Sequence, residues 1–264
     1  MDLQLKGKRA LITGSTAGIG WSIARELAAE GAQVLLNGRD AQRLQDALQR
    51  MQAELPDATI TALQADLATV VGCQQLLDAA GEVDILVNNL GIFEPKDFEQ
   101  ITDMDWQRFF EVNVMSGVRL ARGQLAGMKR RGWGRIVFIS SESGICPPGD
   151  MVHYGMSKSA QLSVSRGLAE TCAGTGVTVN AVLPGPTRTE GVGDFFAKLA
   201  SDAGQTLAET EAAFFKHARP TSLLQRFIEP SEVAALVTYV CSPRAAATNG
   251  AALRVDGGVV RSLI

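Results

Sequence analysis

Short β-rich runs that alternate with helical segments constrain the fold of this chain more than any other feature. Between most of these runs lie segments with helical spacing of apolar residues, such as 19–30 and 41–55. The runs that read as strands are 9–14, 32–37, 58–63, 83–88, 134–140, 177–183 and 251–256. This alternation predicts a doubly wound, Rossmann-type α/β fold, a parallel sheet of seven strands with helices on both faces. Nearly continuous apolar runs such as IVFI fit a sheet that is covered on both sides.

Length and spacing favour a single domain over residues 1–264, because no linker, repeat or low-complexity tract divides the chain. One segment breaks the alternation. Residues 190–228 separate the sixth strand from the final helix and are too long for a plain connection, so we expect helices within them. Paired aromatics at 195–196 and 214–215 predict an apolar lid that is less ordered when no ligand is bound.

Charge and cysteine usage exclude several classes of function. The formal net charge is −3 and no basic block stands out, which argues against nucleic acid as a partner. The amino terminus lacks a signal-peptide pattern, and no apolar run approaches the roughly 18 residues that cross a bilayer. We therefore expect a cytoplasmic protein with reduced thiols and no metal site. Its four cysteines lie far apart and form no CxxC pair: Cys73, Cys146, Cys172 and Cys241.

The first predicted strand ends in TGSTAGIG, a glycine-rich turn that leads into a helix. Gly14, Gly18 and Gly20 allow a sharp turn and a close approach of the backbone to a ligand. The helix N-terminus that follows offers N–H groups and the positive end of a dipole to a pyrophosphate. A tight connection without a ligand is the alternative interpretation, but the position after the first strand favours nucleotide binding.

A tyrosine and a lysine four residues apart stand in HYGMSKSA, residues 153–160. On a helix, Tyr154 and Lys158 lie on one face, one turn apart. An ammonium group near a phenol favours the phenolate, so we expect Lys158 to lower the pKa of Tyr154. The pair would then serve as an acid or base near neutral pH. Taken alone, the pair also fits an exposed helical face.

Eight motifs in order give the chain a resemblance to the short-chain dehydrogenase/reductase family that runs from residue 6 to the carboxyl end. Beside the glycine-rich turn and the Tyr154–Lys158 pair, Asn113 matches the family's active-site asparagine and Ser141 its active-site serine. Leu90 and Met156 depart from the family pattern, which affects the shape of the pocket rather than the chemistry. The remaining matches are NNLG at 88–91, LPGPTRT at 183–189, PSEVA at 230–234 and LRVDGG at 253–258.

The resemblance implies a role for each matching residue. Tyr154 is the general acid for carbonyl reduction and the base for alcohol oxidation. Lys158 lowers its pKa and holds the ribose of the nicotinamide. Ser141 binds the substrate oxygen, Ser140 points away, and Asn113 binds a water that links Lys158 to solvent. The cofactor contacts that the resemblance implies are Gly14, Ser15, Gly18, Ile19, Gly20, Arg39, Asp66, Leu67, Asn89, Gly91, Tyr154, Lys158, Pro184, Gly185, Thr187 and Thr189.

The end of the second strand bears on the choice of cofactor. Enzymes that select NAD place a carboxylate there, whereas this chain has Gly38 followed by Arg39. A guanidinium pairs well with a 2′-phosphate, so NADP(H) is favoured and NAD(H) stays possible. We expect Ser15 and Asn37 to assist Arg39 in binding this phosphate. Asp40 is expected to cap the next helix.

Three further residues near the predicted site have ordinary interpretations. His153 lies about 100° around the helix from Tyr154 and is expected at the pocket rim or surface. Glu142 is expected to be solvated or structural. Cys146 could line the substrate pocket, since no base accompanies it as a nucleophile.

Two functional classes remain open at this point. The first is an oxidoreductase for a small carbonyl or alcohol substrate, with 3-oxoacyl-carrier-protein reductases and sugar or polyol dehydrogenases as models. The second is a catalytically silent sensor or scaffold that binds the dinucleotide. The intact set of Asn113, Ser141, Tyr154 and Lys158 favours the enzyme. The resemblance also implies a homotetramer, and the apolar residues in 102–130, in 154–173 and in the terminal VVRSLI fit subunit contacts.

Overall fold

The computed structural model describes residues 2–263 and contains one parallel sheet with the seven predicted strands. The strands are β1 (Arg9–Ile12), β2 (Gln33–Gly38), β3 (Ile60–Gln64), β4 (Ile85–Asn88), β5 (Gly134–Ile139), β6 (Val177–Pro184) and β7 (Ala252–Val255). Their order across the sheet is β3-β2-β1-β4-β5-β6-β7, and every neighbouring pair is parallel. The predicted Rossmann-type fold is confirmed.

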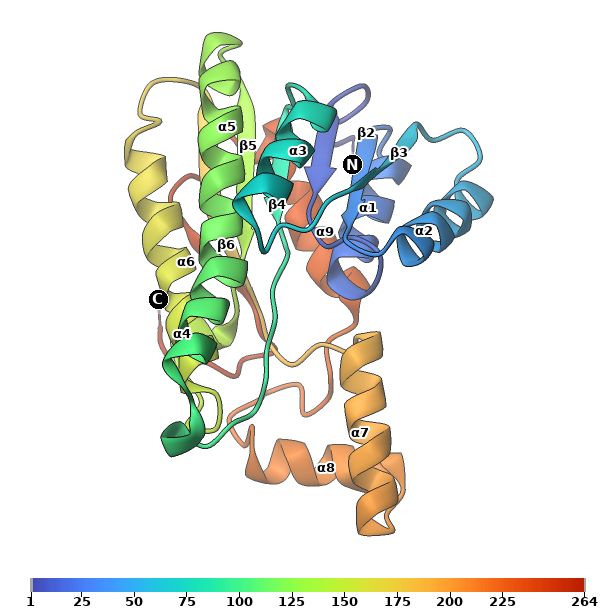
Figure 1. Ribbon diagram of the computed structural model, residues 1–264, viewed down its shortest axis with the longest axis vertical. Helices are drawn as coiled ribbons and strands as arrows, with labels where there is room; N and C mark the ends of the chain where they lie inside the picture. Colours follow the sequence, from blue (N-terminus) through green and yellow to red (C-terminus); the bar gives the residue numbers. More distant parts are fainter. Residues whose placement is uncertain (1, 264) are drawn as a thin grey trace.

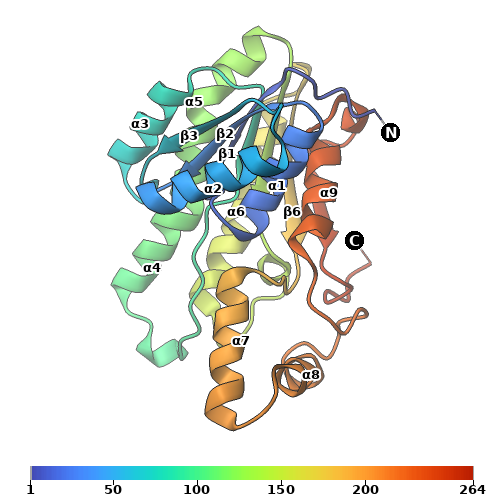
Figure 2. The ribbon, with the colours of Figure 1, turned by 90° about the vertical axis from the view of Figure 1, so that its right-hand side faces the viewer.

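Helices cover both faces of the sheet (Figure 2). One face packs against α1 (Gly18–Ala29), α2 (Ala41–Glu54) and α9 (Pro230–Cys241). The other packs against α3 (Val70–Ala80), α5 (Ser116–Arg130) and α6 (Val152–Glu170). The shorter α4 (Asp103–Phe110) runs through a π-helical turn, Glu111–Met115, into α5. Three 3₁₀ turns complete this part of the chain: Phe98–Gln100, Glu142–Gly144 and Pro243–Ala245.

The strands divide their side chains between two buried cores. In β1, Ala10 and Ile12 face the α1 and α9 side, whereas Leu11 between them faces the α3 and α5 side. Successive residues of a strand point to opposite faces, so a strand that is apolar throughout needs a cover on both. The continuous apolar runs in the sequence are explained by this arrangement.

The order of the strands reverses between β1 and β4, which are neighbours in the sheet although β2 and β3 lie between them in sequence. At such a switch point the connections leave the sheet in opposite directions, and a crevice opens beyond the carboxyl ends of the strands. The glycine-rich turn follows β1, and Ser140 and Ser141 follow β5. The fold therefore brings the predicted site residues to one edge.

Two helices lie within the 190–228 segment, α7 (Glu190–Ala203) and α8 (Leu207–His217). They project from the carboxyl edge of the sheet at the bottom of Figure 1. Their contact is a small aromatic cluster in which the rings lie 5.0 to 5.6 Å apart between centroids. The cluster consists of Phe196, Phe214, Phe215 and Phe227. The hairpin thus has a core of its own, separate from the two cores on the sheet.

Within residues 2–263, no helix has both the length and the apolar character that crossing a bilayer requires.

Candidate active site

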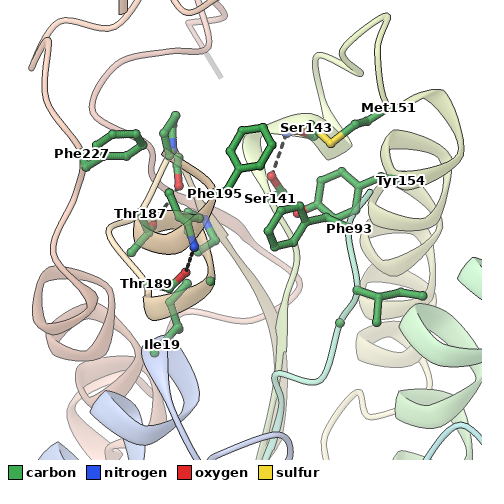
Figure 3. A pocket seen from close by; sticks show the side chains of 18 of the residues that line it. Ile19, Phe93, Ser141, Ser143, Met151, Tyr154, Thr187, Thr189, Phe195 and Phe227 are labelled. Carbon is green, nitrogen blue, oxygen red and sulfur yellow. Dashed lines mark hydrogen bonds between the residues drawn. The ribbon is translucent and has the colours of Figure 1, made fainter. Parts of the chain in front are cut away.

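A cavity of about 710 Å³ opens at the carboxyl edge of the sheet and extends under the α7–α8 hairpin. Figure 3 shows its two walls. Ile19, Thr187 and Thr189 lie on one wall, and Phe93, Ser141 and Tyr154 lie on the other. This volume is in the usual range for a small-molecule or cofactor site.

The glycine-rich turn forms a tight cradle at the end of β1. Gly14 and Gly18 have φ angles of +59° and +55°, which favour glycine. A Cβ at Gly20 would lie 2.4 Å from both the Gly14 carbonyl oxygen and the Asn89 Nδ2. Asn89 braces the turn by donating from Nδ2 to the carbonyls of Thr13 (2.9 Å) and Gly14 (3.0 Å). Helix α1 begins here without a side-chain cap and its first residues line the cavity, so its first N–H groups fit a pyrophosphate.

Two residues expected to assist the 2′-phosphate are used by the turn itself. The Ser15 hydroxyl is buried, donates to the Ile12 carbonyl at 2.8 Å and accepts from the Asn37 N–H at 2.9 Å. The Asn37 amide is buried as well and donates to the carbonyls of Leu63 and Ala65. Both side chains therefore tie β1 to β2 and β3, and their assistance to a 2′-phosphate stays a prediction.

Arginines gather where β2 ends. Arg39 is exposed, and among the described residues its guanidinium has no partner. Arg43, one turn into α2, lines the cavity and lies 4.0 Å from the Glu190 carboxylate at the start of α7. Asp40 caps α2 as predicted, since its side chain accepts from the Arg43 N–H at 2.9 Å. Sequence reasoning missed Arg43, although a basic residue one turn after Arg39 is the signal that would have found it.

Asp66 and Leu67 follow β3, beside the end of β2, and neither is among the described residues that line the cavity. Asp66 is exposed and accepts from the Ala68 N–H, whereas Leu67 is buried in the core.

The segment after β6 closes one side of the cavity. Pro184, Gly185, Thr187 and Thr189 all line it. The Thr187 hydroxyl donates to the Gly185 carbonyl at 2.9 Å, and the Thr189 hydroxyl caps α7. The Thr189 methyl would lie 3.1 Å from a Cβ at Gly18, so this segment packs directly on the glycine turn.

Tyr154 and Lys158 lie on the first turns of α6, as the spacing predicts. The Lys158 ammonium lies 5.6 Å from the centroid of the Tyr154 ring and donates to the Ile139 carbonyl at 2.9 Å. Phe93 meets the Tyr154 ring edge-on at 6.5 Å between centroids. A Cβ at Gly91 would lie 3.3 Å from the Lys158 Nζ, which shows how closely the loop after β4 approaches this lysine.

The electrostatics of this pair differ from the expectation. Burial raises the pKa of Tyr154, and the nearby Glu142 carboxylate raises it further. Burial also lowers the pKa of Lys158 to about 8. The predicted lowering of the Tyr154 pKa is therefore wrong for the protein alone. The lysine is itself desolvated and directed to a carbonyl, so its charge does not offset the burial of the phenol.

Asn113 lies in the π-helical turn between α4 and α5 and is buried. Its Oδ1 accepts from the Ile92 N–H at 2.8 Å, and its Nδ2 donates to the Ile92 carbonyl and to the Ser157 hydroxyl. The inserted residue of a π turn re-aims the helix backbone, a feature common at functional sites. Asn113 thereby joins the β4 loop to the turn of α6 that carries Tyr154 and Lys158.

The two serines after β5 point in different directions. The Ser140 hydroxyl donates to the Lys158 carbonyl at 2.9 Å. The Ser141 hydroxyl lies at the cavity, donates to the Glu142 carboxylate and accepts from the Ser143 N–H (Figure 3). Adjacent residues in an extended segment face opposite ways, which explains the difference.

Glu142 is not solvated, and its buried contacts fit the structural alternative. Its side chain is 7% exposed, lines the cavity and forms an ion pair with Arg219, at 3.2 Å between Oε1 and Nε. Sequence reasoning missed both residues. They are far apart in the chain, and no local pattern joins them.

His153 is likewise placed differently from the expectation at the rim or surface. It is fully buried, with its ring 4.0 Å from Phe109 and 6.1 Å from Trp106 between centroids. Burial lowers its pKa. Both ring nitrogens have no hydrogen-bond partner among the described residues. It is a core residue between α4 and α6.

Other expectations concern pocket shape and metals. Leu90 lines the cavity, whereas Cys146 and Met156 are not among its described lining residues. Residues 2–263 contain no group of three His, Cys, Asp or Glu side chains that could hold a metal ion. All four cysteines are free thiols.

A nucleotide cradle and a tyrosine–lysine pair that face each other across one cavity define a class, the Rossmann-type oxidoreductase that uses a nicotinamide dinucleotide. The family model described as short chain dehydrogenase matches residues 8–200. The chain belongs to this family of NAD(P)-dependent oxidoreductases, as the resemblance implied.

Named relatives cover the whole chain. "Uncharacterized oxidoreductase YvaG" of Bacillus subtilis (strain 168) is 51% identical, with 100% of both chains covered. The 3-oxoacyl-[acyl-carrier-protein] reductase FabG of Aquifex aeolicus (strain VF5) is 31% identical, with 98% of this chain and 100% of the relative covered. The crystal structure of L-sorbose reductase from Gluconobacter frateurii, complexed with NADPH and L-sorbose, has a TM-score of 0.94 and 32% identity, with 100% of both chains covered.

Proposed function

We propose that the protein interconverts a ketone and its secondary alcohol with NADP(H), and that Tyr154 transfers the proton. The observation that carries the proposal is the placement of Tyr154, Lys158 and Ser141 on the cavity wall opposite the glycine cradle. A reacting carbon between these walls would meet the hydride source on one side and the proton source on the other.

Each residue has a distinct task in this proposal. When bound, the dinucleotide supplies or accepts the hydride. Ser141 holds the substrate oxygen and stabilises the charge that develops on it. Tyr154 donates its proton to that oxygen in reduction and removes it in oxidation. Lys158 holds the ribose, and Asn113 binds a water that returns the proton from solvent.

NADP(H) is the cofactor we propose, with NAD(H) as the alternative. Arg39 and Arg43 stand at the end of β2 and the start of α2, where no carboxylate opposes a 2′-phosphate at position 38. The solved L-sorbose reductase was crystallised with NADPH. The contacts proposed for Gly14, Gly18, Ile19, Gly20, Asn89 and Gly91 rest on the cradle described above.

The substrate is open between two models, a 3-oxoacyl thioester and a sugar or polyol. The relatives include a 3-oxoacyl-[acyl-carrier-protein] reductase and an L-sorbose reductase. The sensor alternative gains nothing from the structure, because Ser141, Tyr154, Lys158 and Asn113 are all present at one edge.

Assembly and motion are also part of the proposal. We propose a homotetramer, supported by half-buried apolar residues in a groove between α5 and α6, such as Val118, Leu125 and Val164. The carboxyl tail supports it less, because Val259 and Val260 are buried within the chain; Leu263 is fully exposed, and Ile264 lies outside the described residues.

The α7–α8 hairpin is proposed as the lid. Cytoplasmic location stays a prediction.

Tyr154→Phe tests the mechanism, because it keeps the ring and removes the proton. We expect a loss of about 10²- to 10⁴-fold in kcat on any ketone that the wild type reduces, with NADPH binding nearly unchanged. Tyr239→Phe on α9 is the matched control, since Tyr239 is the other tyrosine and lies partly exposed away from the cavity. Steady-state kinetics across ketones and both cofactors give the result, and more than a few per cent of residual rate in Tyr154→Phe defeats the assignment.

A further inference from the structure

A carboxylate lies directly beside the serine that we propose binds the substrate oxygen. Glu142 Oε2 accepts from the Ser141 hydroxyl and, at 3.0 Å, from the Ser143 N–H. Both Glu142 and Ser141 line the cavity, and the Glu142 side chain is 7% exposed. A charge this well shielded from water needs its hydrogen-bond donors.

The second oxygen of Glu142 is held by an arginine from a distant segment of the chain. Arg219, two residues after the end of α8, donates from Nε to Oε1 at 3.2 Å. Its own side chain is 17% exposed, and its Nη1 donates to the Ala218 carbonyl. The arginine therefore fixes the orientation of the carboxylate and directs Oε2 at Ser141.

The number of protons on Ser141 creates a conflict. A serine hydroxyl has one proton, and here it is donated to Glu142. To bind a ketone oxygen, Ser141 must turn that proton to the substrate. Glu142 Oε2 then keeps only the Ser143 N–H as a donor, and the loss of a donor to a buried charge is costly. A substrate that brings its own donor to Oε2 removes the cost.

Geometry places that donor next to the reacting carbon. The reacting oxygen and Glu142 Oε2 would both lie one hydrogen bond, about 2.7 Å, from the same Ser141 oxygen. A hydroxyl on the neighbouring carbon of the substrate spans this short gap. A 3-oxoacyl thioester has a CH₂ there and then a second carbonyl, which is an acceptor and would be repelled by a carboxylate.

We propose that Glu142 binds a hydroxyl on the carbon adjacent to the reacting one, so that the substrates are α-hydroxy ketones and the corresponding vicinal diols. Arg219 is the positioning residue for Glu142. Phe93, Met151 and Phe195 also line the cavity, and in this proposal they enclose the carbon chain of the substrate (Figure 3). This inference rests on the proposed function, and it decides between the two substrate models left open there.

The test compares two ketones that differ in one hydroxyl, 1-hydroxy-2-butanone and 2-butanone, with NADPH. For the wild type we expect kcat/KM to favour the hydroxy ketone by about 10- to 150-fold, the range for a hydrogen bond to a charged group. Glu142→Gln should reduce this preference about tenfold, because the neutral amide is a weaker acceptor. Glu190→Gln is the matched control for selectivity, since Glu190 lines the cofactor end of the same cavity and should leave the ratio unchanged.

The positioning role of Arg219 is tested by the ratio of kcat/KM for the two ketones, which a loss of folded protein alone would not change. Arg219→Lys should retain part of the preference for the hydroxy ketone over 2-butanone, whereas Arg219→Ala should lose most of that preference. Equal kcat/KM for the two ketones in the wild type, or an unchanged ratio in Glu142→Gln, overturns the proposal.

A binding measurement separates this inference from the proposed function. If neither ketone is turned over, the proposed function fails for these substrates. Calorimetry of 1,2-butanediol against 2-butanol, in the presence of NADPH, then tests Glu142 directly. Tighter binding of the diol by the wild type, lost in Glu142→Gln, supports the inference, and equal affinities in the wild type overturn it.

Discussion

The two walls of the cavity are built in different ways. The wall that we propose binds the cofactor, the cofactor wall, is made mostly of backbone: the glycine turn, the start of α1 and the segment after β6, tied together by Asn89 and Thr189. The wall that we propose binds the substrate, the substrate wall, is made of side chains from distant segments, with Ser141 and Glu142 after β5, Tyr154 on α6 and Arg219 after α8.

The difference shows what each wall can recognise. A cradle of backbone N–H groups binds a pyrophosphate whatever the substrate is, and it depends on glycines at a few positions. A wall of side chains is changed by single substitutions and is therefore where specificity is expected. Changes on one wall should affect one ligand and spare the other.

The largest effect on the substrate wall, after that of Tyr154, is expected at Ser141. Ser141→Ala removes the group proposed to stabilise the developing oxyanion and should lower kcat about 10²- to 10³-fold. NADPH affinity, measured by fluorescence titration, should change little. Ser140→Ala is the control, because the Ser140 hydroxyl is bonded to the Lys158 carbonyl, and it should retain more activity. The reverse order would show that the serine assignment is shifted by one residue.

On the cofactor wall, Arg39→Ala should weaken NADPH binding by about 10- to 150-fold and leave NADH binding nearly unchanged, because a charge-assisted contact to phosphate is lost. Titration of both cofactors measures the two effects. Arg43→Ala provides the comparison. If Arg43→Ala carries the loss and Arg39→Ala does not, the phosphate lies against α2. Equal losses for the two cofactors in Arg39→Ala would contradict the assignment and favour NAD(H).

The smallest effect concerns Lys158, which stands between the two walls. Its pKa is lowered to about 8 by burial, so the unfolded chain holds more protons than the folded one between pH 8 and the ordinary value of 10.5. The contribution of Lys158 to stability therefore rises with pH across this window. Below pH 8 the cost of burying the charged ammonium is fully present. Lys158→Met should raise the free energy of unfolding at pH 7 by about 2 kcal/mol, allowing about 1 kcal/mol for the lost bond to Ile139.

Urea unfolding at pH 7 and pH 9.5, at one protein concentration, measures this difference. The difference in the free energy of unfolding between Lys158→Met and the wild type should be smaller at the higher pH. Lys216→Met on the exposed face of α8 is the control and should show no such narrowing. A gap that is constant with pH would mean that the lysine is not desolvated in the folded protein.

Much of the fold could be predicted from local patterns. The seven strands, the cap at Asp40 and the start of α1 at the glycine turn were all readable, because each depends on residues close together in sequence. The i, i+4 spacing of Tyr154 and Lys158 also placed them correctly on one helix. The errors lie where burial decides. His153 is a polar residue whose surroundings come from another element, α4, and burial in the assembled cavity sets the pKa direction of Tyr154.

The sequence by itself determined the class of fold, the cradle and the placement of Tyr154 and Lys158 on one helical face, because helical and strand periodicity and the freedom of glycine act over a few residues. Only the tertiary structure decided the electrostatics. Glu142 and Arg219 meet across 77 positions of sequence, and the pKa values of Tyr154 and Lys158 follow from the water that packing excludes. Desolvation is a property of the assembled cavity, so no local pattern contains it.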